Sequence, residues 1–255
     1  MQLLSALRHQ TFTTLLPLPA VAATGCGGTA KPPQAAGPAA TCKAGTVQRL
    51  GSGRLAYAAI VRSRAAVSER PGGRTFATFG RLNVNNVPTI FSARAARLDA
   101  SCRRVSYLVQ IPRRPNGVTG WVPARQVHLE PVRTRIVVDL SQRRVTLYRA
   151  GRRVLSAIAA IGSSATPTPT GSFYVNQRLI PVDPGGPFGP GAVGISAFSN
   201  VLTGWTQGGP IAIHGTNEPW SIGKSVSNGC IRLPNPILRK VFRLALNGTP
   251  VLIRR

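Results

Sequence analysis

Short runs of β-branched and aromatic residues, separated by turn residues, constrain the fold of this sequence more than any other feature. Between residues 55 and 132 the runs are Tyr57–Val61, Val105–Ile111 and Gly120–Val122, with turn signals at Pro71–Gly73 and Pro115–Gly117. Short strands with Gly- and Pro-containing turns are typical of small all-β domains. We therefore predict a small β-barrel over residues 55–132.

Residues 134–254 continue the β-rich pattern. A hairpin is indicated by Ile136–Leu140 and Val145–Tyr148, and further strands by Val154–Ala160, Gly171–Val175, Ile211–His214 and Pro250–Ile253. Only Pro236–Leu246 has the apolar spacing of a helix, with a proline suited to the first turn and Asn-Gly after the last. The predicted fold class is mainly β, with one clear helix in the second domain.

The first 26 residues resemble an export signal, with Arg8 before an apolar stretch and small residues at its end. Two endings remain open: an A-x-A-like site at Ala20–Ala22, or a lipoprotein-like box in which Cys26 carries a lipid anchor. Residues 27–54 begin with Gly, Ala and Pro and are predicted to be a flexible tether. We expect an exported protein of the cell envelope, either a membrane-anchored lipoprotein or secreted to the periplasm or wall.

The charge balance is strongly basic. Thirty-two Lys and Arg against 6 Asp and Glu give a formal net charge of +26, which favours a polyanionic partner such as an anionic wall polymer, a membrane surface or nucleic acid. Codon bias in a GC-rich genome produces the same excess of Arg. Nucleic acid is the weakest of the three partners, because the sequence has no aromatic-and-basic module of the known types and begins like an exported protein.

Two residues outside these patterns suggest chemistry. His214 is the last histidine and Cys230 the last cysteine, 16 positions apart (230 − 214), so only tertiary folding can bring them together. A nearby imidazole can take the proton of a thiol and leave the reactive thiolate. Gly229 allows a tight turn beside it, where main-chain N–H groups could form an oxyanion hole. A buried, inert thiol is the alternative, and a metal site lacks a second Cys/His pair at ligand spacing.

The motifs around these residues resemble a known family. HGT at His214–Thr216 and SNGCIRL at Ser227–Leu233 resemble the signature of the L,D-transpeptidase (YkuD) catalytic domain, and GSSATPTPTGSF at Gly162–Phe173 is similar to its upstream motif. This resemblance covers roughly Thr134 to Ile253. The stretch Ile111–Val127 resembles the end of the bacterial SH3-like modules found before wall enzymes, as a structural spacer or a ligand binder.

The resemblance implies roles for individual residues. Cys230 would be the nucleophile and His214 the proton acceptor and donor, with Gly215 orienting the imidazole through its carbonyl. The implied substrate-binding residues are Thr216, Ser227, Asn228, Gly229 and Arg232. Asn228 stands where many members have His, and Arg232 would either bind a carboxylate or brace two loops. No metal or other cofactor is implied.

The implied reaction is cell-wall cross-linking. The thiolate attacks the peptidoglycan stem-peptide bond before the terminal D-alanine, forms a thioester, and transfers the acyl group to an amine of a second stem. Stem peptides would be the partners and β-lactams of the carbapenem type the inhibitors. Two alternatives stay open: an L,D-carboxypeptidase, in which water resolves the thioester, and a non-catalytic wall-binding lipoprotein.

A disulfide between Cys42 and Cys102 is the last prediction. Beyond the signal region only three cysteines remain, and Cys230 must stay reduced to act as the nucleophile. Exported proteins meet oxidising conditions, so the other two are expected to be joined. The alternative is two unpaired thiols, with Cys42 still in the flexible leader.

Overall fold

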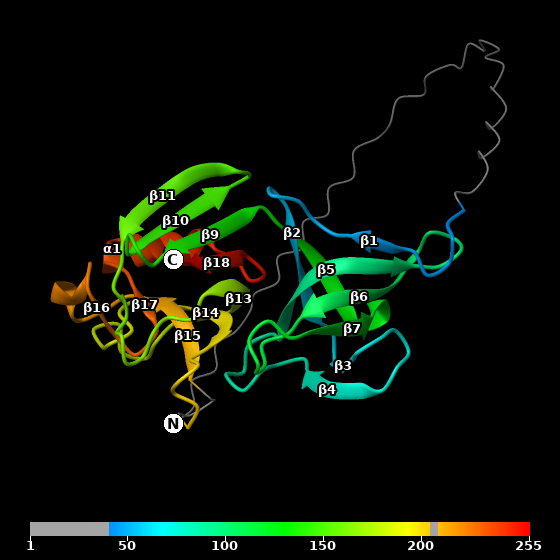
Figure 1. Cartoon of the computed structure of the whole chain (residues 1–255), viewed down its shortest axis with the longest axis horizontal. Helices are drawn as coiled ribbons and strands as arrows, with labels where there is room; N and C mark the ends of the chain where they lie inside the picture. Colours follow the sequence, from blue (N-terminus) through cyan, green and yellow to red (C-terminus); the bar gives the residue numbers. More distant parts are fainter. Residues whose placement is uncertain (1–40, 205–208) are drawn as a thin grey trace, which may run out of the picture. The chain divides into compact units, whose positions relative to one another are not determined.

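The computed structural model describes residues 41–204 and 209–255 (Figure 1). Residues 1–26, including Cys26, and the first half of the predicted tether lie outside the described residues. Strands dominate the described part, which has one α-helix, so the mainly β fold class is confirmed. Neither this helix nor the short 3-10 turns have the length and apolar character needed to cross a membrane.

The first eight strands form one sheet, in the order β4-β3-β7-β6-β5-β2-β8, with β1 paired to β5. Its core contains Val67, Phe91 and Val109, which are fully buried. The strands are β1 (Val47–Arg49), β2 (Ala56–Val61), β3 (Arg64–Ser68), β4 (Thr75–Gly80), β5 (Ile90–Leu98), β6 (Arg104–Gln110), β7 (Thr119–Pro123) and β8 (Val127–Val132), with a 3-10 turn at Ala124–Gln126.

The segment just before β2 differs from the predicted tether of residues 27–54. Its described end contains β1, which pairs antiparallel with β5, and the backbone N–H of Cys42 donates to the Ala100 carbonyl. A disulfide joins Cys42 to Cys102, as predicted. Backbone pairing and this cross-link therefore hold residues 42–49 against the first sheet.

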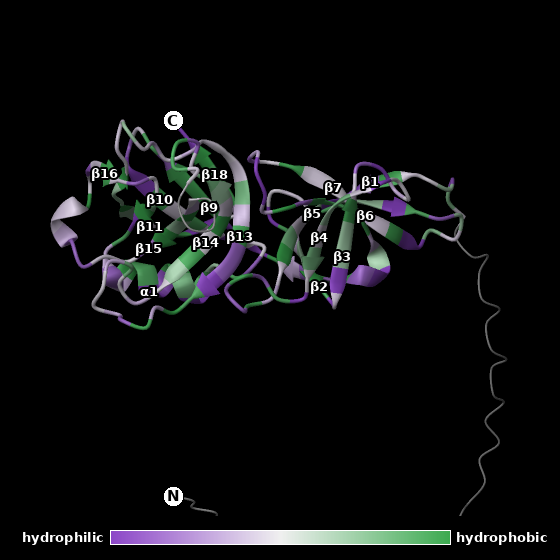
Figure 2. Ribbon diagram, turned by 90° about the horizontal axis from the view of Figure 1, so that it is seen from below, coloured by the Kyte–Doolittle hydropathy of each residue, from purple (hydrophilic) through white to green (hydrophobic). Residues whose placement is uncertain are grey.

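The second sheet has the order β11-β10-β9-β18-β13-β14-β15-β17, and β12 and β16 form a separate two-stranded ladder. The apolar side of α1 (Asn235–Leu244) packs against this sheet through Leu238 and Val241, and hydrophobic residues line its strands in Figure 2. The strands are β9 (Thr134–Asp139), β10 (Arg144–Arg149), β11 (Arg152–Ile158), β12 (Ile161–Gly162), β13 (Gly171–Leu179), β14 (Ala192–Phe198), β15 (Pro210–His214), β16 (Ser225–Ser227), β17 (Ile231–Arg232) and β18 (Pro250–Arg254), with a 3-10 turn at Pro219–Ser221.

A small apolar cluster joins residues of both sheets. Ala58, Ile90 and Val132 pack with Tyr174 of β13, and the Tyr174 hydroxyl donates a hydrogen bond of 3.0 Å to the Ile90 carbonyl. Residues 39–255 accordingly form one compact unit.

Candidate active site

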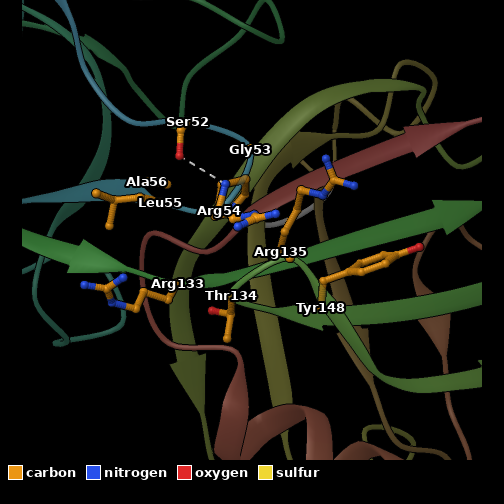
Figure 3. Close-up of a pocket in the computed structure, with 11 residues that line it drawn as sticks. Ser52, Gly53, Arg54, Leu55, Ala56, Arg133, Thr134, Arg135 and Tyr148 are labelled. Carbon is orange, nitrogen blue, oxygen red and sulfur yellow. Dashed lines mark hydrogen bonds between the residues drawn. The ribbon is translucent and has the colours of Figure 1, made fainter.

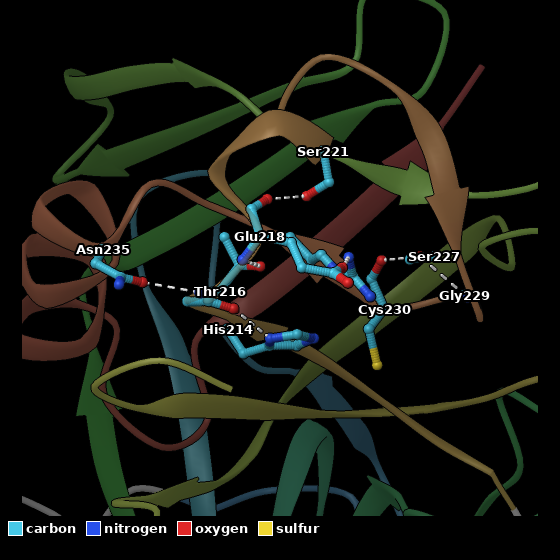
Figure 4. Close-up of polar contacts among 10 residues, drawn as sticks. His214, Thr216, Glu218, Ser221, Ser227, Gly229, Cys230 and Asn235 are labelled. Atoms are coloured by element: carbon cyan, nitrogen blue, oxygen red, sulfur yellow. Dashed lines mark hydrogen bonds and ion pairs between the residues drawn. The ribbon is translucent and has the colours of Figure 1, made fainter. Parts of the chain in front are cut away.

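His214 and Cys230 are brought together by two parallel strands. His214 is the last residue of β15, Cys230 immediately precedes β17, and Ile213 lies opposite Ile231 in the ladder. Figure 4 shows the His214 ring directed toward the side chain of Cys230. Among the described residues no hydrogen bond joins the Cys230 sulfur to the His214 ring. The two groups are therefore neighbours without a direct hydrogen bond.

The tautomer of His214 follows from its backbone contact. Nδ1 lies 2.6 Å from the carbonyl oxygen of Gly215, and because a carbonyl can only accept, Nδ1 carries the proton and Nε2 keeps its lone pair. The family resemblance implied a contact of this kind for the Gly215 carbonyl. The ring is buried, with the edge of Phe188 at a centroid distance of 5.0 Å.

Burial lowers the pKa of His214 from 6.5 to about 4, helped by the positive charge of Arg232 and opposed by the Gly215 hydrogen bond. The pKa of the Cys230 thiol is raised by burial, against the lowering effects of a backbone hydrogen bond at Ala212 and of Arg232. Both groups are therefore neutral at pH 7. An unprotonated imidazole beside an intact thiol is a base that has not yet taken its proton.

Hydrogen bonds shape the loop that carries the thiol. The Ser227 hydroxyl donates to the Cys230 carbonyl at 2.6 Å and accepts from the Gly229 N–H at 3.2 Å. Gly229 has φ +108°, a conformation that side chains disfavour. Because the Gly229 N–H is used inside the loop, an oxyanion hole would have to be built from other main-chain N–H groups. Asn228, at the tip, is exposed.

The Thr-Pro-Thr segment at residues 166–168 is hydrogen-bonded to this loop. Thr166 donates its hydroxyl proton to the Ser227 carbonyl at 2.9 Å, and Thr168 donates to the Gly229 carbonyl at 2.8 Å. Thr168 also accepts from the Gly162 N–H at 2.8 Å. A Cβ at Gly162 would lie 2.4 Å from backbone atoms of Thr166 and Thr168, so this position excludes any side chain.

Arg232 and Thr216 belong to a polar chain behind the pair. The Arg232 guanidinium donates to the Glu218 carboxylate, the Glu218 N–H donates to the Thr216 hydroxyl, and the Thr216 N–H donates to the Asn235 side chain at 2.8 Å. Thr216 is only 4% exposed. In this structure Arg232 therefore pairs with a carboxylate of its own chain, and Thr216 links two loops.

The structure thus brings the residues proposed for catalysis and substrate binding, His214–Thr216, Ser227–Cys230 and Arg232, together around the β15–β17 ladder. Sequence reasoning did not assign roles to Thr166, Thr168, Glu218 and Asn235, although the TPT repeat before Gly171 already marked the first two. No group of three or more His, Cys, Asp or Glu able to hold a metal occurs within residues 41–204 and 209–255.

Comparison with known proteins finds similarity over the part of the chain that contains this site. Residues 133–253 match the family model of the L,D-transpeptidase catalytic domain, YkuD. A Bacillus subtilis relative, provisionally named the L,D-transpeptidase YkuD, is 39% identical over 120 residues, which cover 47% of this chain and 65% of the relative. Its Bacillus licheniformis counterpart is 40% identical over 119 residues, 47% of this chain and 64% of that one. The matches therefore span just under two thirds of these relatives.

Part of the chain also resembles solved structures. A mutant of the Enterococcus faecium L,D-transpeptidase is 27% identical, covers 48% of this chain and 49% of that chain, and has a TM-score of 0.36. The catalytic domain of the E. faecium enzyme acylated by ertapenem is 24% identical, with coverage of 48% and 96% and a TM-score of 0.35. By sequence, residues 133–253 of this chain are therefore similar to the YkuD-type L,D-transpeptidase catalytic domain.

Proposed function

We propose that this protein is a peptidoglycan L,D-transpeptidase with Cys230 as its nucleophile and His214 as its base. The observation that carries the proposal is the neutral His214 ring, held by Gly215 with its free Nε2 on the side of the Cys230 thiol. The family match over residues 133–253 supports the choice of substrate. We also propose that Ser227, Asn228 and Gly229, in the loop before Cys230, bind the stem peptide.

The first half-reaction forms the thioester. As the Cys230 sulfur attacks the carbonyl before the terminal D-alanine, Nε2 of His214 takes the thiol proton. The bond to D-alanine then breaks, and the imidazolium gives that proton to the leaving amine. Each ion alone would be unfavourable at this buried position, but the thiolate and imidazolium form together and offset one another.

The second half-reaction forms the cross-link. An amine of a second stem attacks the thioester carbon, His214 takes the amine proton, and the proton returns to the sulfur as it leaves. If water attacks instead, the same residues make a carboxypeptidase. The intact Cys230/His214 pair favours an enzyme over a non-catalytic wall-binding protein.

The remaining proposals concern the rest of the chain. We propose that residues 55–132 form an SH3-like β-barrel and that the protein belongs to the cell envelope, either as a lipoprotein anchored at Cys26 or as a secreted protein. These follow from the Ile111–Val127 resemblance and the signal-like first 26 residues.

The test of the proposed function is acylation by a carbapenem, followed by intact-protein mass spectrometry. Ertapenem acylates the E. faecium catalytic domain, and we expect one covalent adduct on the wild-type protein and none on Cys230→Ala. A circular dichroism spectrum should show that the variant is folded. An adduct on Cys230→Ala, or none on folded wild-type protein, would contradict the proposal that this protein is a cysteine enzyme. Incubation with a stem tetrapeptide and an amine acceptor then separates cross-linked from hydrolysed product.

A further inference from the structure

Three arginines line one pocket, far from the Cys230 loop in sequence. The pocket has a volume of about 250 Å³ and is lined by Arg54, Arg133 and Arg135, together with Thr134 and Tyr148 (Figure 3). Arg54 precedes β2 of the first sheet, whereas Arg135 and Tyr148 belong to β9 and β10 of the second. Neither half of the described chain forms this pocket alone.

Local contacts restrict two of the three arginines, Arg54 and Arg135. Arg54 sits in a turn closed by a bridge between Ser52 and Leu55, and its N–H donates to the Ser52 hydroxyl at 3.2 Å. Its side chain passes over Gly151, where a Cβ would lie 3.1 Å from Arg54 Cγ. The Arg135 guanidinium lies over the Tyr148 ring, 5.2 Å from its centroid. A guanidinium ordered before binding loses less entropy when it meets a ligand.

No acid of the chain neutralises this pocket. All six Asp and Glu residues lie in the described part, and the ion pairs formed there join Asp99, Glu130, Asp139 and Glu218 to other partners. None of the six makes an ion pair or hydrogen bond with Arg54, Arg133 or Arg135. Like charges gathered without a counter-charge destabilise a fold, and a bound anion removes that penalty.

The basic character continues along the adjoining strands. On β10, Tyr148 lies opposite Arg135 of β9 and Arg153 of β11, so the three side chains form a row on one face of the sheet. Arg149 lies directly opposite Arg152, but successive side chains of a strand alternate between faces, so this pair lies on the other face of the sheet. On the face of the pocket, positive charge extends from Arg135 past Tyr148 to Arg153, which suits a ligand with repeated negative charges.

We propose that this pocket and the adjoining arginine row bind the phosphodiester backbone of an anionic polymer. Guanidinium groups match phosphate oxygens in bidentate geometry, and several arginines around one pocket suit a group with more than one free oxygen. A concave pocket with a row of charges favours a chain that is gripped along its length. Insertion into a lipid surface uses a flat face with an apolar side instead. This inference does not depend on the chemistry at Cys230.

The test compares two triple variants of equal charge. Arg54→Gln/Arg133→Gln/Arg135→Gln removes the pocket arginines, and Arg239→Gln/Lys240→Gln/Arg243→Gln removes three exposed charges from α1. Binding of fluorescent poly(glycerol phosphate) is measured by anisotropy over a series of salt concentrations. Vesicles containing phosphatidylglycerol form the second arm, and circular dichroism and carbapenem acylation report on folding.

We expect the pocket variant to lose roughly 10-fold or more in affinity for the polymer, with a salt slope shallower by about 2, since each phosphate contact contributes about 0.7 to 0.9. The α1 variant should bind within about 3-fold of wild type, because only long-range attraction is lost. Equal losses in the two variants would show that net charge alone attracts the polymer and would overturn the proposal. Binding to vesicles without binding to the polymer would also overturn it.

Discussion

The carbonyl oxygen of Gly215 lies 2.6 Å from Nδ1 of His214 and leaves Nε2 as the only ring nitrogen able to accept a proton. A Cβ at Gly215 would approach Asn235 Oδ1 to 2.4 Å and Pro190 Cδ to 2.7 Å. The residue after His214 must therefore be glycine for reasons of space, and the same residue supplies the contact that orients the ring.

Replacement of His214 by Gln should leave the fold intact and slow carbapenem acylation by at least about 100-fold, the usual contribution of a positioned base. Gln retains a donor for the Gly215 carbonyl but cannot take the thiol proton. Time-resolved mass spectrometry gives the acylation rate constant, and circular dichroism checks the fold. Near-normal acylation would mean that another group activates Cys230.

Stability should depend on pH through His214. Its pKa is about 4 in the folded protein and 6.5 without burial, so between these values the unfolded chain binds the extra proton. The free energy of unfolding should then fall as pH drops from 6.5 to 4, by on the order of 3 kcal/mol. Urea unfolding at several pH values measures this.

His214→Gln is the matched control for that experiment, because it keeps the contact to Gly215 but does not titrate. Its unfolding free energy should change less than that of the wild type over the same pH range. Parallel curves for the two proteins would show that other groups cause the pH dependence.

Thr168→Val should loosen the loop that carries Cys230. The substitution preserves shape but removes a hydroxyl that donates to the Gly229 carbonyl and accepts from the Gly162 N–H. Leaving these buried groups unpaired should cost roughly 2–4 kcal/mol of stability and should slow acylation under conditions where the variant is still folded.

Thr170→Val is the control for this loop variant, since Thr170 is exposed and belongs to the same segment. We expect it to unfold and to acylate like the wild type. If both valine variants behave alike in chemical denaturation and acylation, the hydrogen bonds of Thr168 have no role.

Much of the β pattern was predictable because half-buried strands alternate apolar and polar residues. The runs at Tyr57–Val61 and Val105–Ile111 correspond to β2 and β6 within one residue at each end. The helix predicted at Pro236–Leu246 is α1, which ends earlier, at Leu244, because Ala245 leaves the helical conformation with ψ 87°.

Other strands carried no such signal. The sequence of β5, IFSARAARL, is rich in helix-forming Ala, Arg and Leu, and its strand conformation depends on pairing with β1, β2 and β6. At the site, the motifs pointed to His214 and Cys230, but tertiary contacts such as Arg232 with Glu218 depend on loops that local sequence does not specify.

Removal of the Cys42–Cys102 disulfide should destabilise the first sheet. The bond closes a loop with a sequence separation of 60, which contributes roughly 4 kcal/mol in the chain-entropy model. The double variant Cys42→Ser/Cys102→Ser leaves Cys230 untouched and so separates stability from chemistry. Its unfolding free energy should fall by about that amount, with acylation retained while it is folded; unchanged stability would contradict the expectation.

Tyr174 links the two halves of the described chain. Its ring is fully buried and its hydroxyl donates a hydrogen bond to the Ile90 carbonyl. A buried polar group of the second sheet thus has its hydrogen-bond partner in the first. Fusing residues 134–255 to a different N-terminal module would leave that hydroxyl without a hydrogen-bond acceptor, unless the new module offered a carbonyl at the same place. The second domain should therefore be less stable when it is separated from the first sheet.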